Sequence, residues 1–331
     1  MATAKGKTLV MVNQMGDWRT RFEFRSLLAL FAASLFLPLV FSKPLATEIV
    51  IYALFALGFN LLLGHTGIIS FGHAAYLGAG SYAAGMTIVY AHCGVWSALL
   101  SATLGGTVVA AVIGLLDIRR RGAYFAMISL AFAQMLYFIA LSPMKRWTGG
   151  DDGLKLPPLS IDFPLHLDLS DQLQLYFFVL VIGVIAVLAQ WRLLNSPFGH
   201  VLKGTRENED RIRACGYNID RIKFVSLLFS GLFSGLAGGL LVVYLGAASV
   251  NILFWMTSGV VVMATVLGGT HTFLGPVIGS AIFLFLRDSL SMYVERWEMW
   301  IGALFMALII LFKEGVWGTI VETAQRRCHK P

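Results

Sequence analysis

Polar side chains and glycines interrupt a long apolar stretch of the sequence between residues 60 and 73. Hydroxyl, amide and imidazole groups are costly in hydrocarbon unless protein or water satisfies them, and a broken helix frees backbone groups that need such partners. We therefore expect a helix break here that lines a path for a polar solute. The residues assigned to this path are Asn60, Gly64, His65, Thr66, Ser70, Gly72 and His73. For the two histidines, packing inside the protein is an equally good interpretation, and close helix packing accounts for most glycines of the region.

A second interruption, between residues 267 and 275, is similar to the first. Both combine glycine, threonine and histidine inside apolar sequence, and paired breaks in two halves of a chain point to a path between repeats. Gly268 and Thr270 are assigned to the path on this basis, together with Gln134, a polar group within an apolar span. The alternatives are that the similarity reflects only helix-packing glycines and that Gln134 bridges two helices.

Catalytic chemistry is not indicated by the sequence. It contains no glycine-rich phosphate loop ending in Gly-Lys-Ser/Thr, no His, Cys, Asp and Glu cluster with metal-ligand spacing, and no serine nucleophile elbow. We expect no catalytic residue, no metal site and no cofactor bound by this chain. Glu48 and Asp288 fall near the ends of apolar spans, so a buried ionisable relay for proton-coupled transport is also missing. The energy for any active transport would then come from another subunit.

The composition places these motifs in a membrane. Of the 331 residues, 57% are hydrophobic and 13% are charged, and the mean hydropathy is +0.76, which excludes a soluble enzyme, a disordered chain and a disulfide-built protein. We predict an all-α, polytopic bundle of about ten transmembrane helices, with eight to ten allowed because the glycine-rich breaks also suit re-entrant segments. The predicted spans are residues 26–42, 47–63, 73–91, 95–116, 122–142, 173–191, 224–247, 252–268, 274–291 and 297–312.

The distribution of basic residues predicts the orientation. With a cytoplasmic N-terminus, 19 of the 25 Lys and Arg residues fall in segments on the inner side, in agreement with the positive-inside rule. Both termini are therefore expected in the cytoplasm, with residues 1–25 and 316–331 as tails and residues 26–315 as the transmembrane domain. The long connection at 143–172 is expected on the outer face. The basic run Arg119-Arg120-Arg121 is interpreted as a topology determinant that contacts anionic lipid.

The predicted cytoplasmic connection, residues 192–223, is the most charged segment. Ser196 and Pro197 form a helix-start signal, and Gly216 is expected just beyond the end of the helix. Opposite charges four residues apart favour a surface helix, in the pairs Arg206/Asp210, Glu207/Arg211 and Glu209/Arg213. A charged elbow of two helices with an apolar stripe favours docking of a cytoplasmic partner over a solvated connector, and the residues of the stripe are Ile212, Cys215, Ile219 and Ile222.

Four stretches, taken together and in order, resemble a known family. They read NLLLGHTGIISFGHA at 60–74, RGAYFAM at 121–127, TGGDDGL at 148–154, and SPFG at 196–199 followed by RENE at 206–209. Over about residues 45–315 the chain resembles the LivM-type permease subunit of the branched-chain amino acid ABC importers. The resemblance implies an all-helical, type II importer-like permease with two related halves, in the inner membrane of a bacterium.

The resemblance also implies partners. These are a second homologous permease of LivH type, two cytoplasmic ATPase subunits that bind the ATP, and a periplasmic substrate-binding protein; membrane lipids surround the permeases and no nucleic acid is involved. In this family the loop that matches residues 203–217 is the coupling helix, which enters a groove on the ATPase, and Gly216 matches its glycine. The residues expected to couple to the ATPase are Arg206, Glu207, Asn208, Glu209, Arg211 and Gly216. From their outer location, the residues expected to dock the binding protein are Thr148, Gly149, Gly150, Asp151 and Asp152.

The mechanism implied is alternating access, in which closure of the ATPase dimer moves the coupling helices and the permeases rock about the path. A related importer for urea, short amides or aromatic acids is the alternative; urea permeases of the family tend to carry Gly-Gly-Asn-Asn-Gly where this chain has Gly-Gly-Asp-Asp-Gly at 149–153, which favours amino acids. A secondary transporter or channel working alone predicts no ATPase partner. A membrane enzyme lacks any supporting residues.

Overall fold

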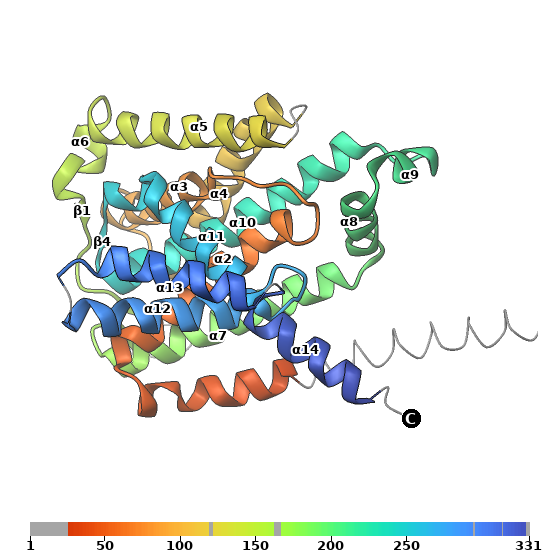
Figure 1. Cartoon of the computed structure of the whole chain (residues 1–331). Coiled ribbons are helices and arrows are strands. Elements are labelled where there is room, and N and C mark those ends of the chain that lie inside the picture. The colour runs from red at the N-terminus through yellow and green to blue at the C-terminus, as the bar shows by residue number, and fades with distance from the viewer. Residues whose placement is uncertain (1–25, 119–121, 162–166, 294, 313, 329–331) are drawn as a thin grey trace, which may run out of the picture. The chain divides into compact units, whose positions relative to one another are not determined.

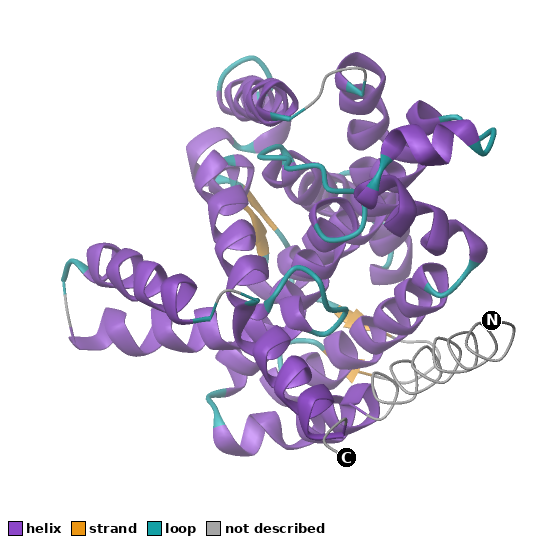
Figure 2. Ribbon diagram, turned by 45° about the vertical axis from the view of Figure 1, so that its right-hand side comes forward, coloured by secondary structure: helices purple, strands orange, loops and turns teal. Residues whose placement is uncertain are grey.

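A computed structural model describes residues 26–118, 122–161, 167–293, 295–312 and 314–328 of the chain. The basic run Arg119–Arg121 therefore lies outside the described residues. The chain divides into two compact units, Met1–Ser42 and Lys43–Pro331. In the first unit the described part is a short apolar helix, Ser26–Val40. The second unit holds every other element, and helices dominate it (Figure 2).

The second unit consists mainly of helices, several of which Figure 1 labels. In chain order they are α2 (Lys43–Leu63), α3 (His73–Val89), α4 (Val95–Asp117), α5 (Ala123–Leu141), α6 (Lys145–Thr148), η1 (Gly150–Asp152), α7 (Gln172–Leu194), α8 (Pro197–Glu207), α9 (Glu209–Ala214), α10 (Ile219–Leu245), η2 (Val250–Leu253), α11 (Trp255–Gly268), α12 (Gly275–Tyr293), α13 (Trp297–Leu311) and α14 (Gly315–Cys328). Two antiparallel strand pairs are inserted, β1 (Leu154–Lys155) with β4 (Ala247–Ala248) and β2 (Ser160–Ile161) with β3 (Leu167–Asp168).

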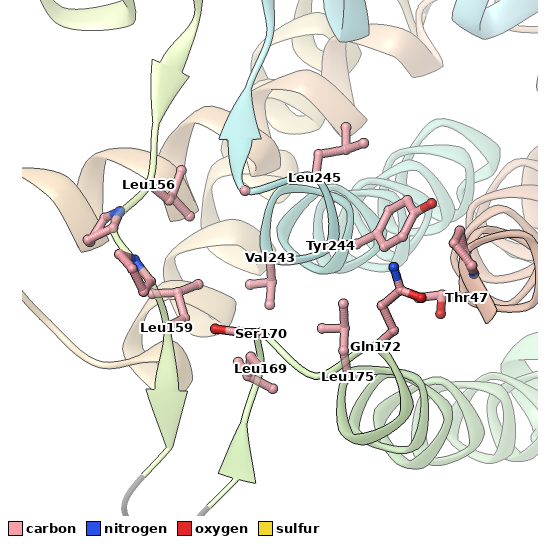
Figure 3. Close-up of a pocket in the computed structure, with 14 residues that line it drawn as sticks. Thr47, Leu156, Leu159, Leu169, Ser170, Gln172, Leu175, Val243, Tyr244 and Leu245 are labelled. Carbon is pink, nitrogen blue, oxygen red and sulfur yellow. The ribbon is translucent and has the colours of Figure 1, made fainter.

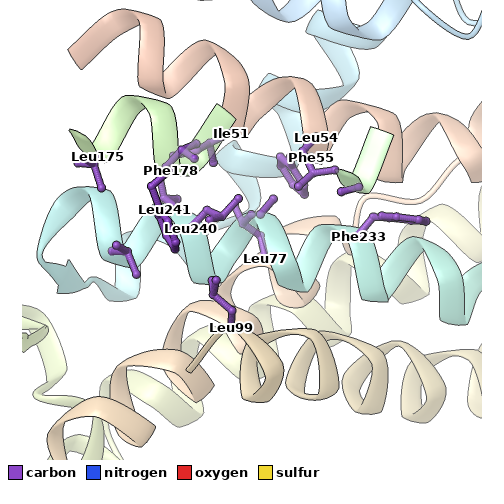
Figure 4. Packing of buried hydrophobic residues seen from close by; sticks show 14 of the residues in the cluster. Ile51, Leu54, Phe55, Leu77, Leu99, Leu175, Phe178, Phe233, Leu240 and Leu241 are labelled. Carbon is purple, nitrogen blue, oxygen red and sulfur yellow. The ribbon is translucent and has the colours of Figure 1, made fainter. Parts of the chain in front are cut away.

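Helix α10 is the central element of the second unit. The side-chain oxygen of Asn218 accepts a hydrogen bond from the Arg221 N–H at 3.2 Å and so caps its start, while Gly246 ends it with a φ of +66°. The helix packs against α2, α3 and α4. Figure 4 shows the apolar core formed there, and its labelled residues are Ile51, Leu54, Phe55, Leu77, Leu99, Leu175, Phe178, Phe233, Leu240 and Leu241.

Glycines let three helices cross at very short separation. A Cβ atom placed on Gly80 of α3 would lie 2.6 Å from the Cα of Gly235, and one placed on Gly106 of α4 would lie at the same distance from that atom. No side chain fits at such a crossing, because the neighbouring atoms are backbone. Small residues that allow this approach are the usual source of helix association in membranes, where no hydrophobic force acts between helices. Close packing is therefore the role of Gly80.

The predicted all-α membrane architecture is supported, but the predicted count of ten spans is not. In the described residues, six stretches are long and apolar enough to cross a membrane: α2, α4, α5, α7, α10 and the stretch Glu298–Thr323, which runs across residue 313. The helices Ser26–Val40 and α11 are shorter, and α3 has only 17 residues. Helix α12 is 19 residues long but carries Arg287 and Asp288. The chain is a multi-pass membrane protein.

Candidate functional site

The two predicted helix breaks lie side by side. The first separates α2 from α3 and the second separates α11 from α12. The Asn60 amide nitrogen donates to the Thr272 carbonyl oxygen at 3.3 Å, across 212 residues of sequence. At Gly64 a side chain is excluded by the Thr270 carbonyl oxygen and by Asn60. The structure thus brings Asn60 and Gly64 of one half together with the 268–275 segment of the other.

Polar groups of the first break satisfy its own backbone. His65 Nδ1 donates to the Asn60 carbonyl oxygen at 3.2 Å, the Thr66 hydroxyl donates to the Leu62 carbonyl oxygen at 2.5 Å, and the Ser70 hydroxyl oxygen accepts from the Gly72 N–H at 3.2 Å. These are the bonds that a broken helix needs where water is scarce. Burial lowers the pKa of His65 to about 4, so its ring is neutral at physiological pH.

His73 has a packed position rather than an open one. Its ring is fully buried, and its centroid lies 4.8 Å from that of Phe59 and 5.0 Å from that of Tyr76. The Ser230 hydroxyl donates to the Gly58 carbonyl oxygen at 2.7 Å, so the 2.9 Å contact between His73 Nε2 and Ser230 Oγ is one in which the imidazole donates. His73 therefore ties α3 to α10, which was the alternative interpretation from the sequence.

The hydroxyl of Thr272 stabilises the turn of the second break. The Thr272 hydroxyl donates to the Gly269 carbonyl oxygen at 3.2 Å and accepts from the Gly275 N–H at 3.1 Å. Gly269 has a φ of +111°, and buried Gly268 lies against the backbone of Gly275 and Gly279. The turn is therefore held by backbone contacts that leave no room for larger side chains.

The charged connection at residues 192–223 forms two helices, as expected for the two-helix elbow. Helix α8 begins at Pro197 behind Ser196, as predicted, and ends at Glu207; Asn208 then caps α9, its side-chain oxygen accepting from the Arg211 N–H at 3.0 Å. The pairs Arg206/Asp210 and Glu207/Arg211 therefore span a break and do not share a helix face. Asp210 contacts Arg213 at 3.6 Å, and Glu209 contacts Lys223 of α10 at 2.6 Å.

The end of this loop agrees with the prediction, but its apolar stripe does not. Gly216 has a φ of +90°, its N–H donates to the Arg213 carbonyl oxygen at 2.9 Å, and the Tyr217 N–H donates to the Ile212 carbonyl oxygen at 3.4 Å, which is a Schellman motif. Ile219 and Ile222 are buried within the chain, so they offer no surface to a partner. Cys215, the stripe residue at this turn, is exposed together with Gly216, Tyr217 and Asn218.

Arg206 points away from the surface on which it was expected to contact an ATPase. One guanidinium nitrogen donates to the Gly64 carbonyl oxygen and the other contacts Nε2 of His271 at 3.3 Å. The remaining candidates for coupling are more accessible: Glu207, Asn208 and Arg211 are exposed, and Glu209 is half-buried beside Lys223. Partial burial lowers the pKa of the Arg206 guanidinium, which stays charged because its ordinary value is far above 7.

The segment expected to dock a binding protein, residues 148–152, is partly buried in the chain. The Thr148 side chain is buried, and its hydroxyl donates to the Ala140 carbonyl oxygen at 2.6 Å. Gly149 and Gly150 form the turn that follows, Gly150 being buried, whereas Asp151 and Asp152 are exposed. Beyond them, β1 pairs with β4 and so fastens this loop to the connection between α10 and α11. Of the five residues, only the two carboxylates have accessible side chains.

Comparison with known proteins places this architecture in a family. Residues 43–312, which include both breaks and the charged loop, match the family model described as "Branched-chain amino acid transport system / permease component". The chain belongs to this permease family. It is 25% identical over 296 residues to the high-affinity branched-chain amino acid transport system permease protein LivM of Salmonella typhimurium, covering 83% of this chain and 69% of that protein.

Two further relatives are similar to the permease. The LivM protein of Escherichia coli, of the same printed description, is 26% identical over 314 residues, which are 88% of this chain and 74% of that protein. The xylose transport system permease protein XylH of Haemophilus influenzae is 29% identical over 129 residues, 38% of this chain and 34% of that protein. The relatives thus serve solutes of different classes.

Gln134 has a polar side chain on an apolar helix of the permease. It lies on α5 and is half-buried, and its amide nitrogen is buried without a hydrogen-bond partner in the described part of the chain. Its amide nitrogen therefore makes no bridging bond to a second helix.

An ion pair between α2 and α12 is the polar contact that the sequence analysis missed. Arg287 contacts Glu48 at 2.6 Å, and their side chains are 26% and 19% exposed. The two residues are 239 positions apart, so no sequence spacing indicates the pair. Their only signal is a charge near the end of an apolar span, which is costly unless it is paired.

Replacing Glu48 by glutamine is expected to lower the free energy of unfolding of the purified permease by about 1–3 kcal/mol, because Arg287 keeps its charge and loses its charged acceptor. Thermal unfolding in detergent measures the change. The charge-swapped double variant Glu48→Arg, Arg287→Glu is the control and should recover most of the loss. Equal stability of wild type and Glu48→Gln would show that the pair contributes nothing to the fold.

A cavity of about 570 Å³ lies where α2 and α7 begin and α10 ends, against the connection that precedes α7. Figure 3 shows Thr47, Gln172 and Tyr244 on one side of it and Leu156 and Leu159 on the other. All these segments belong to the side that the charge distribution predicts to be external. Apolar walls with a few polar groups at one end suit a small amphipathic solute.

Proposed function

We propose that this chain is the membrane-spanning permease subunit of an ABC importer that carries branched-chain amino acids across the plasma membrane of a bacterium. Both termini and the α8–α9 loop would face the cytoplasm. The proposed partners are a second homologous permease, two ATPase subunits and a periplasmic substrate-binding protein. Membership of the permease family and the similarity to two LivM proteins over most of the chain support this proposal.

The observation that carries the proposal is the juxtaposition of a charged loop with two helix breaks. The breaks come from opposite halves of the chain and are joined by the bond from Asn60 to Thr272. The α8–α9 loop lies against the first break through Arg206 and leaves Glu207, Asn208 and Arg211 exposed. A loop that contacts the path on one side and presents charges on the other can transmit movement from an ATPase, and this supports alternating access driven by the partner subunits.

Leucine, isoleucine and valine are the proposed substrates. Their apolar side chains suit the leucine-rich wall of the outer cavity, and their charged backbone groups suit its polar end at Thr47, Gln172 and Tyr244. Selection would rest mainly on the binding protein. Because a xylose permease is also among the relatives, substrate identity needs a direct competition experiment.

The test is to purify the permease after crosslinking native membranes, identify the proteins that accompany it, and reconstitute the complex in lipid vesicles. We expect a second permease and ATPase subunits, and ATP-dependent uptake of radiolabelled leucine that excess isoleucine or valine reduces. Uptake that persists without ATPase and follows a proton gradient would contradict the proposal in favour of a secondary transporter. Competition by urea, acetamide or xylose, but not by isoleucine, would reassign the substrate.

A further inference from the structure

Three segments of the cytoplasmic side converge on one side chain, that of Arg206. It stands in the last turn of α8, and it reaches Gly64 in the first break and His271 in the second. These partners are 142 and 65 residues away in sequence and belong to opposite halves of the chain.

The chemistry of each contact suits a fixed link. The guanidinium is a rigid planar fork that only donates, so Nε2 of His271 must be unprotonated and accept. The other acceptor, the Gly64 carbonyl oxygen, follows the last residue of α2, where unpaired carbonyls and the negative end of the helix dipole favour a cation. The side-chain stem lies against Gly67, where an added Cβ would be 3.3 Å from Cγ of Arg206.

The α8–α9 loop and the two breaks each have further contacts that do not involve Arg206. Glu209, at the start of α9, binds Lys223 of α10 at 2.6 Å, and Lys223 is 5% exposed. Asn60 joins the two breaks directly through the Thr272 carbonyl oxygen. Arg206 is therefore placed between one body, the α8–α9 loop, and another, the paired breaks. A displacement of α8 must move both breaks or pull the guanidinium from two acceptors at once.

We propose that Arg206 is a positioning residue that transmits movement of the α8–α9 loop to both helix breaks, rather than a residue that contacts the ATPase. This rests on the proposed function, since the movement is that of an importer driven by partner ATPases. It differs from the role expected from the sequence, in which Arg206 is part of the docking surface. The distinction is measurable, because a docking residue controls ATPase binding and a transmitting residue controls uptake for a given rate of ATP hydrolysis.

The test uses the whole reconstituted complex with radiolabelled leucine and measures uptake, ATP hydrolysis and retained ATPase subunits separately. For Arg206→Ala we expect retention of the ATPase subunits and at least half of the ATP hydrolysis, with uptake lowered tenfold or more. Arg206→Lys, which keeps the charge but loses the fork, should give intermediate uptake. The matched control is Arg192→Ala, an exposed arginine in the last turn of α7, which should leave all three measurements unchanged.

His271, which is exposed and contacts Arg206, allows a second and independent test. His271→Ala should lower uptake in the same way, His271→Gln should restore it because the amide oxygen can accept from Arg206, and the double variant with Arg206→Ala should be no worse than Arg206→Ala alone. If Arg206→Ala does not fold, the comparison of His271→Ala with His271→Gln still tests the proposal.

Two outcomes overturn the inference while the proposed function stands: uptake within twofold of wild type in Arg206→Ala and His271→Ala, or loss of the ATPase subunits from Arg206→Ala, which would make it a docking residue. A wild-type complex with no ATP-driven leucine uptake would instead refute the proposed function, and the inference with it.

Discussion

Replacing Gly216 by arginine is expected to abolish ATP-driven leucine uptake while the permease remains folded and inserted. Gly216 ends α9 with a φ of +90°, and a Cβ placed on it would meet nothing within 4 Å. The backbone strain of a non-glycine residue there is about 1 kcal/mol, too little to unfold a protein of this size. The new side chain would instead project from the exposed turn into the proposed ATPase groove, so at least a hundredfold loss of uptake is expected in vesicles.

The matched control is Gly216→Ala, which carries the same strain without the length or the charge. It should retain most of the uptake, and it should still bind the ATPase subunits, whereas Gly216→Arg should lose them on purification in mild detergent. Uptake in Gly216→Arg equal to that of wild type would contradict docking at this turn. Equal loss in both variants would show that strain in the Schellman motif, and not a blocked surface, is responsible.

Replacing Gly235 by leucine is expected to cause the largest loss of stability. Gly235 lies on α10 where α3 and α4 cross it, and a Cβ there would lie 2.5 Å from the Ala102 carbonyl oxygen and 3.0 Å from the Cα of Gly106. These atoms belong to backbone and cannot rotate away, so the helices must separate. Overpacking costs typically 1–3 kcal/mol even where side chains can adjust, and we expect about 3 kcal/mol or more here. Thermal unfolding of the purified permease measures this.

Gly259→Leu provides the control for the glycine-to-leucine change itself. Gly259 is also helical, in α11, but a Cβ there would meet nothing within 4 Å. Its unfolding temperature should stay close to that of wild type, while the yield and unfolding temperature of Gly235→Leu should fall clearly. Equal unfolding temperatures for the two variants would mean that the crossing of α3, α4 and α10 tolerates separation and that its close approach does not hold the fold together.

The predicted start of α8 and end of α9 are correct, because helix ends depend on interactions between residues close in sequence. Pro197 starts α8 and Gly216 follows α9 in the left-handed conformation, because a missing N–H and a missing Cβ act within one turn of the chain. The ion pairs in this loop were predicted less well. Spacing of four residues presumes a continuous helix, but α8 ends at Glu207 and the Asn208 side chain caps α9, so two of the three pairs span the break. A cap of this kind competes with helix continuation at little cost.

The predicted count of ten spans is not confirmed, and the apolar stripe is wrong at two of its four residues. Hydropathy does not reveal whether a helix faces lipid or other helices, and the 17-residue α3, predicted as a span, is largely buried against α4 and α10. In the same way Ile219 and Ile222 form an apolar stripe that α10 buries inside the chain rather than presenting to a partner. Apolar character predicts that a helix face is buried. Whether lipid, another helix of the chain or a partner protein covers that face depends on the tertiary structure.

Composition and short-range spacing are enough to identify a multi-pass helical membrane protein with two polar breaks and one charged loop, because hydrophobicity, glycine and charge act over a few residues. The contacts of Asn60 with Thr272, of Glu48 with Arg287, and of Arg206 with Gly64 and His271 arise from the packing of distant segments and have no signal in the sequence. Each of these contacts joins residues 65 to 239 positions apart. Polar groups buried in a membrane protein must find partners, but which partner they find is set by the crossing of helices and not by the spacing of residues.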